Sequence, residues 1–189
     1  MYSLKIIIAS TRPGRQGPAV ANWIHVLCKE NSLFQVELID LAKLNLPFLD
    51  EPKHPRLKQY IHEHTKKWSD TIEAADAFII VTCEYNFGYP APLKNALDYL
   101  FVEWNYKPVG FVSYGGIAGG TRAVQQLKQV VTAQKMMPIT ESVNIPFFTK
   151  HITEDGKFIG DDHLLKSAND MMAELVKWTA SLKEMRARM

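Results

Sequence analysis

Hydrophobic residues in this chain form short unbroken runs that alternate with longer stretches of helical periodicity. The runs predict five strands, at residues 4–9, 34–40, 77–82, 109–114 and 138–143. Apolar residues spaced three and four apart predict helices at residues 18–30, 57–74, 91–101, 121–133 and 162–186. A proline-punctuated loop is expected at 46–55, and the connection at 147–158 has room for a short hairpin around Asp155 and Gly156.

The strict alternation of strand and helix predicts an α/β fold. Such alternation favours a doubly wound parallel sheet with helices on both faces, joined by right-handed crossovers. The run at 77–82 is the most apolar, as expected for a central strand that is covered on both sides. With 189 residues, 47% of them hydrophobic, the chain is expected to form one domain over residues 1–189. In such sheets ligands bind beyond the carboxyl ends of the strands.

Composition excludes several classes of function. A formal net charge of +2 is too small a basic excess for a nucleic-acid-binding protein. No apolar stretch is long enough to span a membrane. The two cysteines, Cys28 and Cys83, have neither a disulfide framework nor zinc-ligand spacing, so a reducing cytoplasm is expected. His62 and His64 are too close in sequence to share a helical face, so we expect surface residues and no metal site.

The loop after the first predicted strand, residues 10–17, has a composition that suits a phosphate group. It contains two hydroxyl side chains, two arginines and two glycines directly before a helix, whose free N–H groups attract anions. Its spacing matches neither the Walker A motif nor the glycine motif of dinucleotide-binding folds. The alternative is a polar turn whose arginines are merely solvated.

Two further loops suit a flat ligand. The loop at 82–90 carries Tyr85, Phe87 and Tyr89, whose rings can flank a planar group while backbone N–H groups bind its polar edge. The alternative is packing of these rings against a neighbouring helix or a second subunit. The loop at 113–122 has two glycine pairs, which let the main chain approach a flat ligand closely. Its alternative is a flexible turn with Thr121 as the cap of the next helix.

Three segments of the chain resemble the NADPH-dependent FMN reductase family, which includes azoreductase-like, quinone and chromate reductases. They are STRPGR at 10–15, EYNFGYPAPLKNALDYL at 84–100 and SYGGIAGGTRAVQQL at 113–127, and the central one is the most specific. The resemblance extends through nearly the whole chain and implies a flavodoxin-like five-stranded parallel sheet of order 2-1-3-4-5. Family members usually have proline immediately before EYN, where this chain has Cys83. Cys83 is interpreted either as a small buried residue that ends the strand or as a redox-active thiol near the flavin.

The resemblance also implies which residues bind FMN and how the chain assembles. Those expected to hold the phosphate are Ser10, Arg12, Arg15, Gln16, Gly17 and Pro18. Those expected to border the isoalloxazine are Glu84, Tyr85, Asn86 and Phe87 at one edge and Tyr114, Gly115 and Gly116 at the other. A homodimer or homotetramer is expected, with a contact at the helix that carries Lys94, Asn95 and Asp98.

The expected activity is that of an NAD(P)H-dependent oxidoreductase. A hydride would pass from the nicotinamide to FMN, and electrons would then pass to a quinone, azo compound, free flavin or metal oxyanion. The chemistry takes place at N5 of the flavin, so no catalytic acid or base is assigned. Donor and acceptor would share one exposed ring face, which predicts ping-pong kinetics. The alternatives are a flavodoxin-like electron carrier, disfavoured by the mild positive charge, and a redox-responsive binding module. A further alternative is a plain NAD-binding Rossmann domain, which is disfavoured because this chain lacks the glycine motif of that fold.

Overall fold

The computed structural model describes residues 1–189 and contains one sheet of order β2-β1-β3-β4-β5 in which every neighbouring pair is parallel. The strands are β1 (Tyr2–Ile8), β2 (Phe34–Asp40), β3 (Ala77–Cys83), β4 (Pro108–Tyr114) and β5 (Met137–Ile145). The helices are α1 (Gly17–Glu30), α2 (Leu41–Leu44), α3 (Glu63–Glu73), α4 (Ala91–Asp98), α5 (Thr121–Ala133) and α6 (Asp162–Ala187). Short 3-10 turns lie at Pro55–Leu57, Val102–Trp104 and Phe148–His151. The flavodoxin-like fold predicted from the sequence is confirmed.

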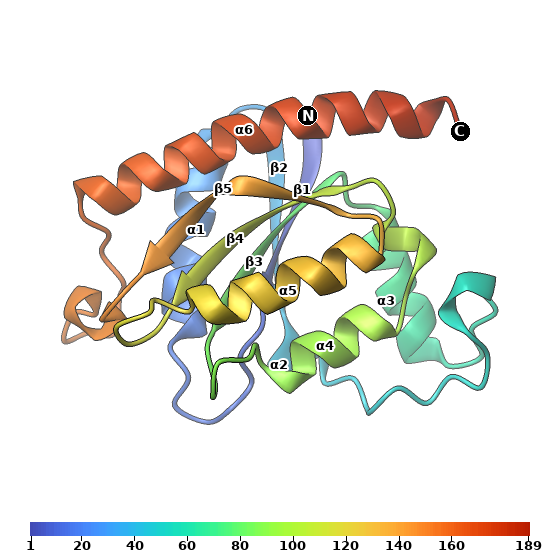
Figure 1. Ribbon diagram of the computed structural model, residues 1–189, viewed down its shortest axis with the longest axis horizontal. Coiled ribbons are helices and arrows are strands. Elements are labelled where there is room, and N and C mark those ends of the chain that lie inside the picture. Colours follow the sequence, from blue (N-terminus) through green and yellow to red (C-terminus); the bar gives the residue numbers. More distant parts are fainter.

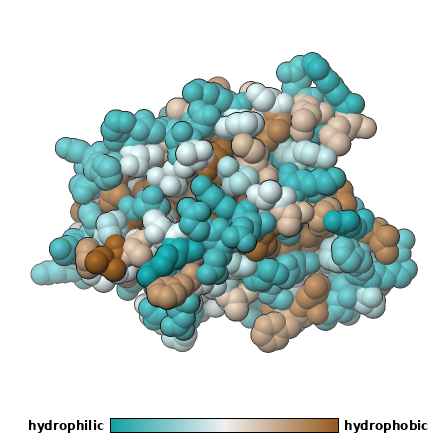
Figure 2. All heavy atoms as spheres, viewed as in Figure 1, coloured by the Kyte–Doolittle hydropathy of each residue, from teal (hydrophilic) through white to brown (hydrophobic).

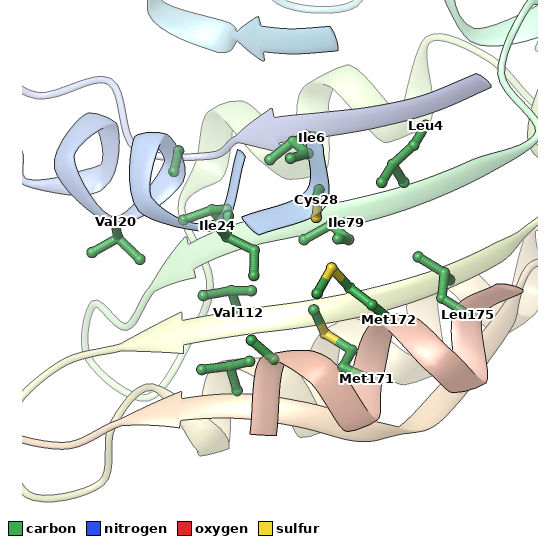
Figure 3. Packing of buried hydrophobic residues seen from close by; sticks show 14 of the residues in the cluster. Leu4, Ile6, Val20, Ile24, Cys28, Ile79, Val112, Met171, Met172 and Leu175 are labelled. Atoms are coloured by element: carbon green, nitrogen blue, oxygen red, sulfur yellow. The ribbon is translucent and has the colours of Figure 1, made fainter. Parts of the chain in front are cut away.

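Two hydrophobic cores lie on opposite faces of the sheet, because successive side chains of each strand point to opposite sides. Helices α1 and α6 cover one face, and α3, α4 and α5 cover the other (Figure 1). In the first core, Val20 of α1 and Met171 of α6 point toward the strands that carry Ile6 and Ile79 (Figure 3). The second core is built around Trp68, Trp104 and the other face of β3. All of β3 is buried, as its unbroken apolar run predicted.

The largest error in the predicted elements concerns the start of the second predicted helix, which corresponds to α3. The apolar spacing placed this start at residue 57, but α3 begins at Glu63. Lys58 has a left-handed backbone with φ of 51°, which ends the preceding turn. The Glu51 carboxylate then accepts hydrogen bonds from the amides of Ile61 and His62 at 2.9 and 3.1 Å. These contacts hold the segment before α3 as a loop.

Smaller differences occur elsewhere. The one-turn helix α2 was not predicted, and it forms because the Asp40 side chain caps it by accepting from the amide of Ala42 at 3.0 Å. The helix predicted at 91–101 ends at Asp98. An antiparallel bridge joins Ile152 to Phe158, as in the optional hairpin.

His62 and His64 lie side by side although their spacing excludes a shared helical face, because His62 precedes α3 and is not part of the helix. The two rings stack with centroids 5.2 Å apart, and the Nε2 atom of His64 lies 3.0 Å from a carboxylate oxygen of Asp50. Both side chains are partly exposed.

Figure 2 shows a mainly hydrophilic face with scattered hydrophobic residues. None of the helices combines the length and apolar character that crossing a bilayer requires.

Candidate functional site

The loops that follow β1, β3 and β4 share one cleft, because these three strands are neighbours in the sheet and end at the same edge (Figure 1). The cleft has a volume of about 190 Å³. Its lining consists of Arg12, Arg15, Gln16, Cys83, Glu84, Tyr85, Tyr114, Gly115, Gly116 and Phe148. Two hydroxyl groups lie beside it, since Tyr114 of β4 donates a hydrogen bond to the buried Ser10 hydroxyl at 3.2 Å.

The start of α1, next to these hydroxyls, has features that suit an anion. A Cβ atom at Gly17 would lie 2.4 Å from Ser10 Oγ and 2.9 Å from the Tyr114 hydroxyl oxygen, so only glycine brings the helix this close. Helix α1 has no side-chain cap and no acidic residue in its first turn. Among residues 10–16, only the amide of Arg15 donates to a backbone carbonyl, that of Arg12 at 3.3 Å. The other N–H groups suit the oxygens of a phosphate.

The two arginines of this loop have different surroundings. Arg15 makes a bidentate pair with Asp40 at 2.8 and 2.6 Å, and its Nη1 atom also donates to the Ser10 carbonyl at 2.7 Å. That hydrogen-bonded pair raises the pKa of Arg15. Burial alone would raise the pKa of Asp40, but hydrogen bonds from Arg15 and a backbone amide outweigh burial and lower it. Arg12 is exposed, donates to the Pro13 carbonyl at 3.1 Å and has no carboxylate partner. Arg12 is therefore the cation free to bind an anion.

The loop after β3 folds back as a two-residue hairpin. The amide of Tyr85 donates to the Gly88 carbonyl at 2.8 Å, and the reverse bond is 2.9 Å. Asn86 and Phe87 between them both have positive φ, of 50° and 70°. A left-handed backbone costs a non-glycine residue roughly 1–2 kcal/mol. The hairpin therefore holds strain of the kind found at ligand sites, with the Phe87 ring exposed.

Glu84, immediately before this hairpin, has an incomplete set of partners. Its side chain is 8% exposed, and its Oε1 atom accepts from Nε of Arg122 in α5 at 2.7 Å. The guanidinium of Arg122 also lies over the Phe87 ring, 4.0 Å from its centroid. The second oxygen, Oε2, is buried and has no hydrogen-bond partner. Buried polar atoms are rarely left unpaired, so this oxygen fits a site that a ligand completes.

The glycine-rich loop after β4 brings bare backbone to the cleft. Gly115 and Gly116 line it, and a Cβ atom at Gly116 would meet no atom within 4 Å. Gly120 has φ of +80°, and a Cβ atom there would lie 3.0 Å from the Tyr114 carbonyl oxygen. Thr121 is the first residue of α5 rather than its cap, and its hydroxyl donates to the Ala118 carbonyl at 2.9 Å.

Most of the residues proposed from the sequence lie at this cleft. Ser10 and Gly17 lie beside its lining, whereas Pro18, Asn86 and Phe87 are not part of it. The lining also includes two residues outside the predicted set, Cys83 and Phe148. The thiol of Cys83 is buried at the end of β3. Phe148 packs edge-on against Tyr114 with centroids 5.1 Å apart, and its irregular connection after β5 gave no sequence signal.

This chain is similar to known flavin-dependent reductases in both sequence and fold. Residues 3–150 match the family model of NADPH-dependent FMN reductases. An NAD(P)H-dependent FMN reductase of Schizosaccharomyces pombe is 40% identical over 181 residues, which is 87% of this chain and 90% of that protein. That of Saccharomyces cerevisiae is 33% identical over 162 residues, covering 79% and 84%. The solved structure of the flavoenzyme NAD(P)H:(acceptor) oxidoreductase FerB from Paracoccus denitrificans has a TM-score of 0.74 at 20% identity, covering 96% and 98%.

Proposed function

The chain belongs to the NADPH-dependent FMN reductase family, and we propose that it is an FMN-dependent NAD(P)H oxidoreductase that reduces small acceptors. The observation that carries this proposal is the cleft shared by three loops, with an anion site at one end and aromatic and bare backbone groups at the other. Its volume of about 190 Å³ is below the roughly 300–1,000 Å³ of typical ligand pockets. A bound flavin would therefore keep part of its ring accessible to a second ligand.

The phosphate of FMN would lie at the start of α1. Ser10 offers a hydroxyl, Arg12 a free guanidinium, and the segment through Gln16, Gly17 and Pro18 the N-terminal end of the helix. Arg15 faces the cleft, but Asp40 and the Ser10 carbonyl already engage its donors, so we assign it the positioning of the loop. Because Arg15 is paired with Asp40 and Arg12 has no carboxylate partner, Arg12 would be the charge partner of the phosphate.

The isoalloxazine would lie between the loops after β3 and β4. When bound, FMN supplies a ring that accepts a hydride from NAD(P)H and passes two electrons to an acceptor. Tyr85 offers a ring face in the cleft, and Gly115 and Gly116 offer backbone groups. Phe87 lies outside the cleft lining, with an exposed ring in the hairpin that follows Glu84. Donor and acceptor would use the same opening in turn, which gives ping-pong kinetics with quinones, azo compounds, free flavin or metal oxyanions as acceptors.

A second, more apolar cavity supports self-association. It has a volume of about 460 Å³ and lies between the chain after β2 and the start of α4, with Thr11 of the phosphate loop in its lining. Phe48 also lines it and is 87% exposed. We propose that this face joins two copies in a homodimer, or in the dimers of a homotetramer. Asn95 of α4 holds the face within one chain by donating to the Pro47 carbonyl at 2.7 Å.

We also propose that residues 1–189 form one FMN-binding domain that works in the cytoplasm. Both core layers rest on the same sheet, so neither would be stable without the other. Cys28 and Cys83 are buried and unpaired, as is usual in a reducing compartment.

A visible spectrum and a kinetic series test the proposed function. The protein reconstituted with FMN should show two flavin bands, and anaerobic NADPH or NADH should bleach them. Initial rates with nicotinamide donor and quinone varied together should give parallel double-reciprocal lines. A protein that binds no FMN would overturn the proposal. A yellow protein that neither donor bleaches would favour a flavodoxin-like electron carrier, and a partner that binds only one redox state without turnover would favour a binding module.

A further inference from the structure

Glu84 is the only carboxylate in the lining of the cleft. The other charged side chains there are Arg12, which forms no ion pair, and Arg15, whose charge Asp40 neutralises. Cys83, Tyr85 and Tyr114 are the remaining titratable groups, and burial raises the pKa of both tyrosines. A negative charge at this end of the cleft therefore comes from Glu84 alone.

Arg122, the ion-pair partner of Glu84, lies outside the cleft lining. Arg122 bonds one carboxylate oxygen, but it is not part of the cleft lining and its side chain is 48% exposed. The other carboxylate oxygen is buried and unpaired. A ligand in the cleft is thus nearer to the negative member of the ion pair than to the positive one. Solvent screens the two charges unequally, since the carboxylate is buried and the guanidinium is not.

We propose that the Glu84–Arg122 pair sets the redox potential of the flavin bound in the cleft, an inference that rests on the proposed function. Reduction by hydride transfer adds two electrons and one proton to FMN, so the reduced flavin carries one more negative charge than the oxidised one. The Glu84 carboxylate disfavours that charge, and Arg122 offsets part of the effect. Changing either member alone therefore shifts the potential, and the two changes shift it in opposite directions.

The test is a redox titration of the FMN-loaded protein, with the parent and every variant measured at the same pH. Glu84→Gln removes the negative charge, and the midpoint potential should rise. Arg122→Gln leaves the carboxylate uncompensated, and the potential should fall, while Arg122→Lys should stay close to the parent value. A tenfold change in the affinity ratio of reduced to oxidised FMN corresponds to about 30 mV for a two-electron couple, and we expect shifts of at least this size.

Matched controls come from a second ion pair in the chain. Glu184 and Arg188 form an exposed pair at the end of α6, so Glu184→Gln and Arg188→Gln make the same changes in net charge away from the cleft. Neither control should move the potential.

A merely structural pair would give a different result. Glu84→Gln and Arg122→Gln would then both bind oxidised FMN more weakly in a fluorescence titration. Their midpoint potentials would shift in the same direction or not at all. Either pattern overturns the inference. If the parent protein binds FMN and is bleached by NADPH while every variant keeps its potential, the inference fails and the proposed function stands. If the parent protein binds no FMN, both fail.

Discussion

Replacing Asp40 by asparagine should both destabilise the protein and loosen the phosphate loop. The change leaves the Arg15 guanidinium without its charge partner, although the side chains of the two are only 16% and 12% exposed. Breaking a buried pair costs about 3–5 kcal/mol, and an exposed one contributes at most about 1 kcal/mol. For this partly buried pair we expect a loss of about 2–3 kcal/mol in the free energy of unfolding.

The same change should weaken FMN binding. Arg15 also donates to the Ser10 carbonyl at 2.7 Å, so its orientation determines where the loop places the Ser10 hydroxyl. We expect FMN to bind at least about tenfold more weakly, which corresponds to about 1.4 kcal/mol. Urea unfolding of the apoprotein and flavin fluorescence titration measure the two effects. Asp170→Asn is the matched control, because its exposed pair with Lys166 should contribute little.

The stability difference should depend on pH with a definite sign. The pKa of Asp40 is lower in the folded protein than in the unfolded chain. Its contribution is therefore fully present above the unfolded value of about 3.9 and is lost as the pH falls through the folded pKa. The parent protein and Asp40→Asn should differ fully at neutral pH and converge in acid. Equal stability at neutral pH together with unchanged FMN affinity would refute the role assigned to the pair.

Three other changes separate the parts of the site. Arg12→Ala should weaken FMN binding by about 1.5–3 kcal/mol without changing urea unfolding or the affinity for riboflavin, which lacks the phosphate, and equal losses for both flavins would contradict it. Gly17→Ala places a methyl group 2.4 Å from Ser10 Oγ, so the free energy of unfolding should fall by about 1–3 kcal/mol in urea, and an unchanged midpoint would show that the helix start can move. Phe48→Ser should lower the dimer fraction in sedimentation velocity without reducing monomer stability, and an unaltered assembly would exclude this face as the interface.

The strand and helix order was predictable because each element carries its own periodicity. The bounds of β2 and α5 agree with the predicted ranges, and the unbroken apolar run of β3 correctly indicated a buried strand. The segment before α3 was not predictable in this way. Its apolar residues have helical spacing, but the Glu51 carboxylate engages the amides of Ile61 and His62, and that contact appears only once the chain has folded.

The loops of the site were predictable for a topological reason, whereas the contacts within them were not. Neighbouring parallel strands end at one edge, so the loops that start at Ser10, Glu84 and Tyr114 had to meet if the sheet order was right. The pairing of Arg15 with Asp40 joins residues 25 positions apart and has no local signal. The sequence alone therefore gives no sign that Asp40 and the Ser10 carbonyl engage the Arg15 guanidinium.

Cys83 illustrates how a local departure from the family pattern can leave the site geometry intact. In β3 it is paired in register with Tyr114 of β4, and both residues line the cleft. Proline at this position would lack the backbone N–H that cysteine keeps at the end of the strand. The hairpin that follows is nevertheless closed by its own two hydrogen bonds between Tyr85 and Gly88. Because these bonds do not involve residue 83, the turn can close in the same way whether cysteine or proline precedes Glu84.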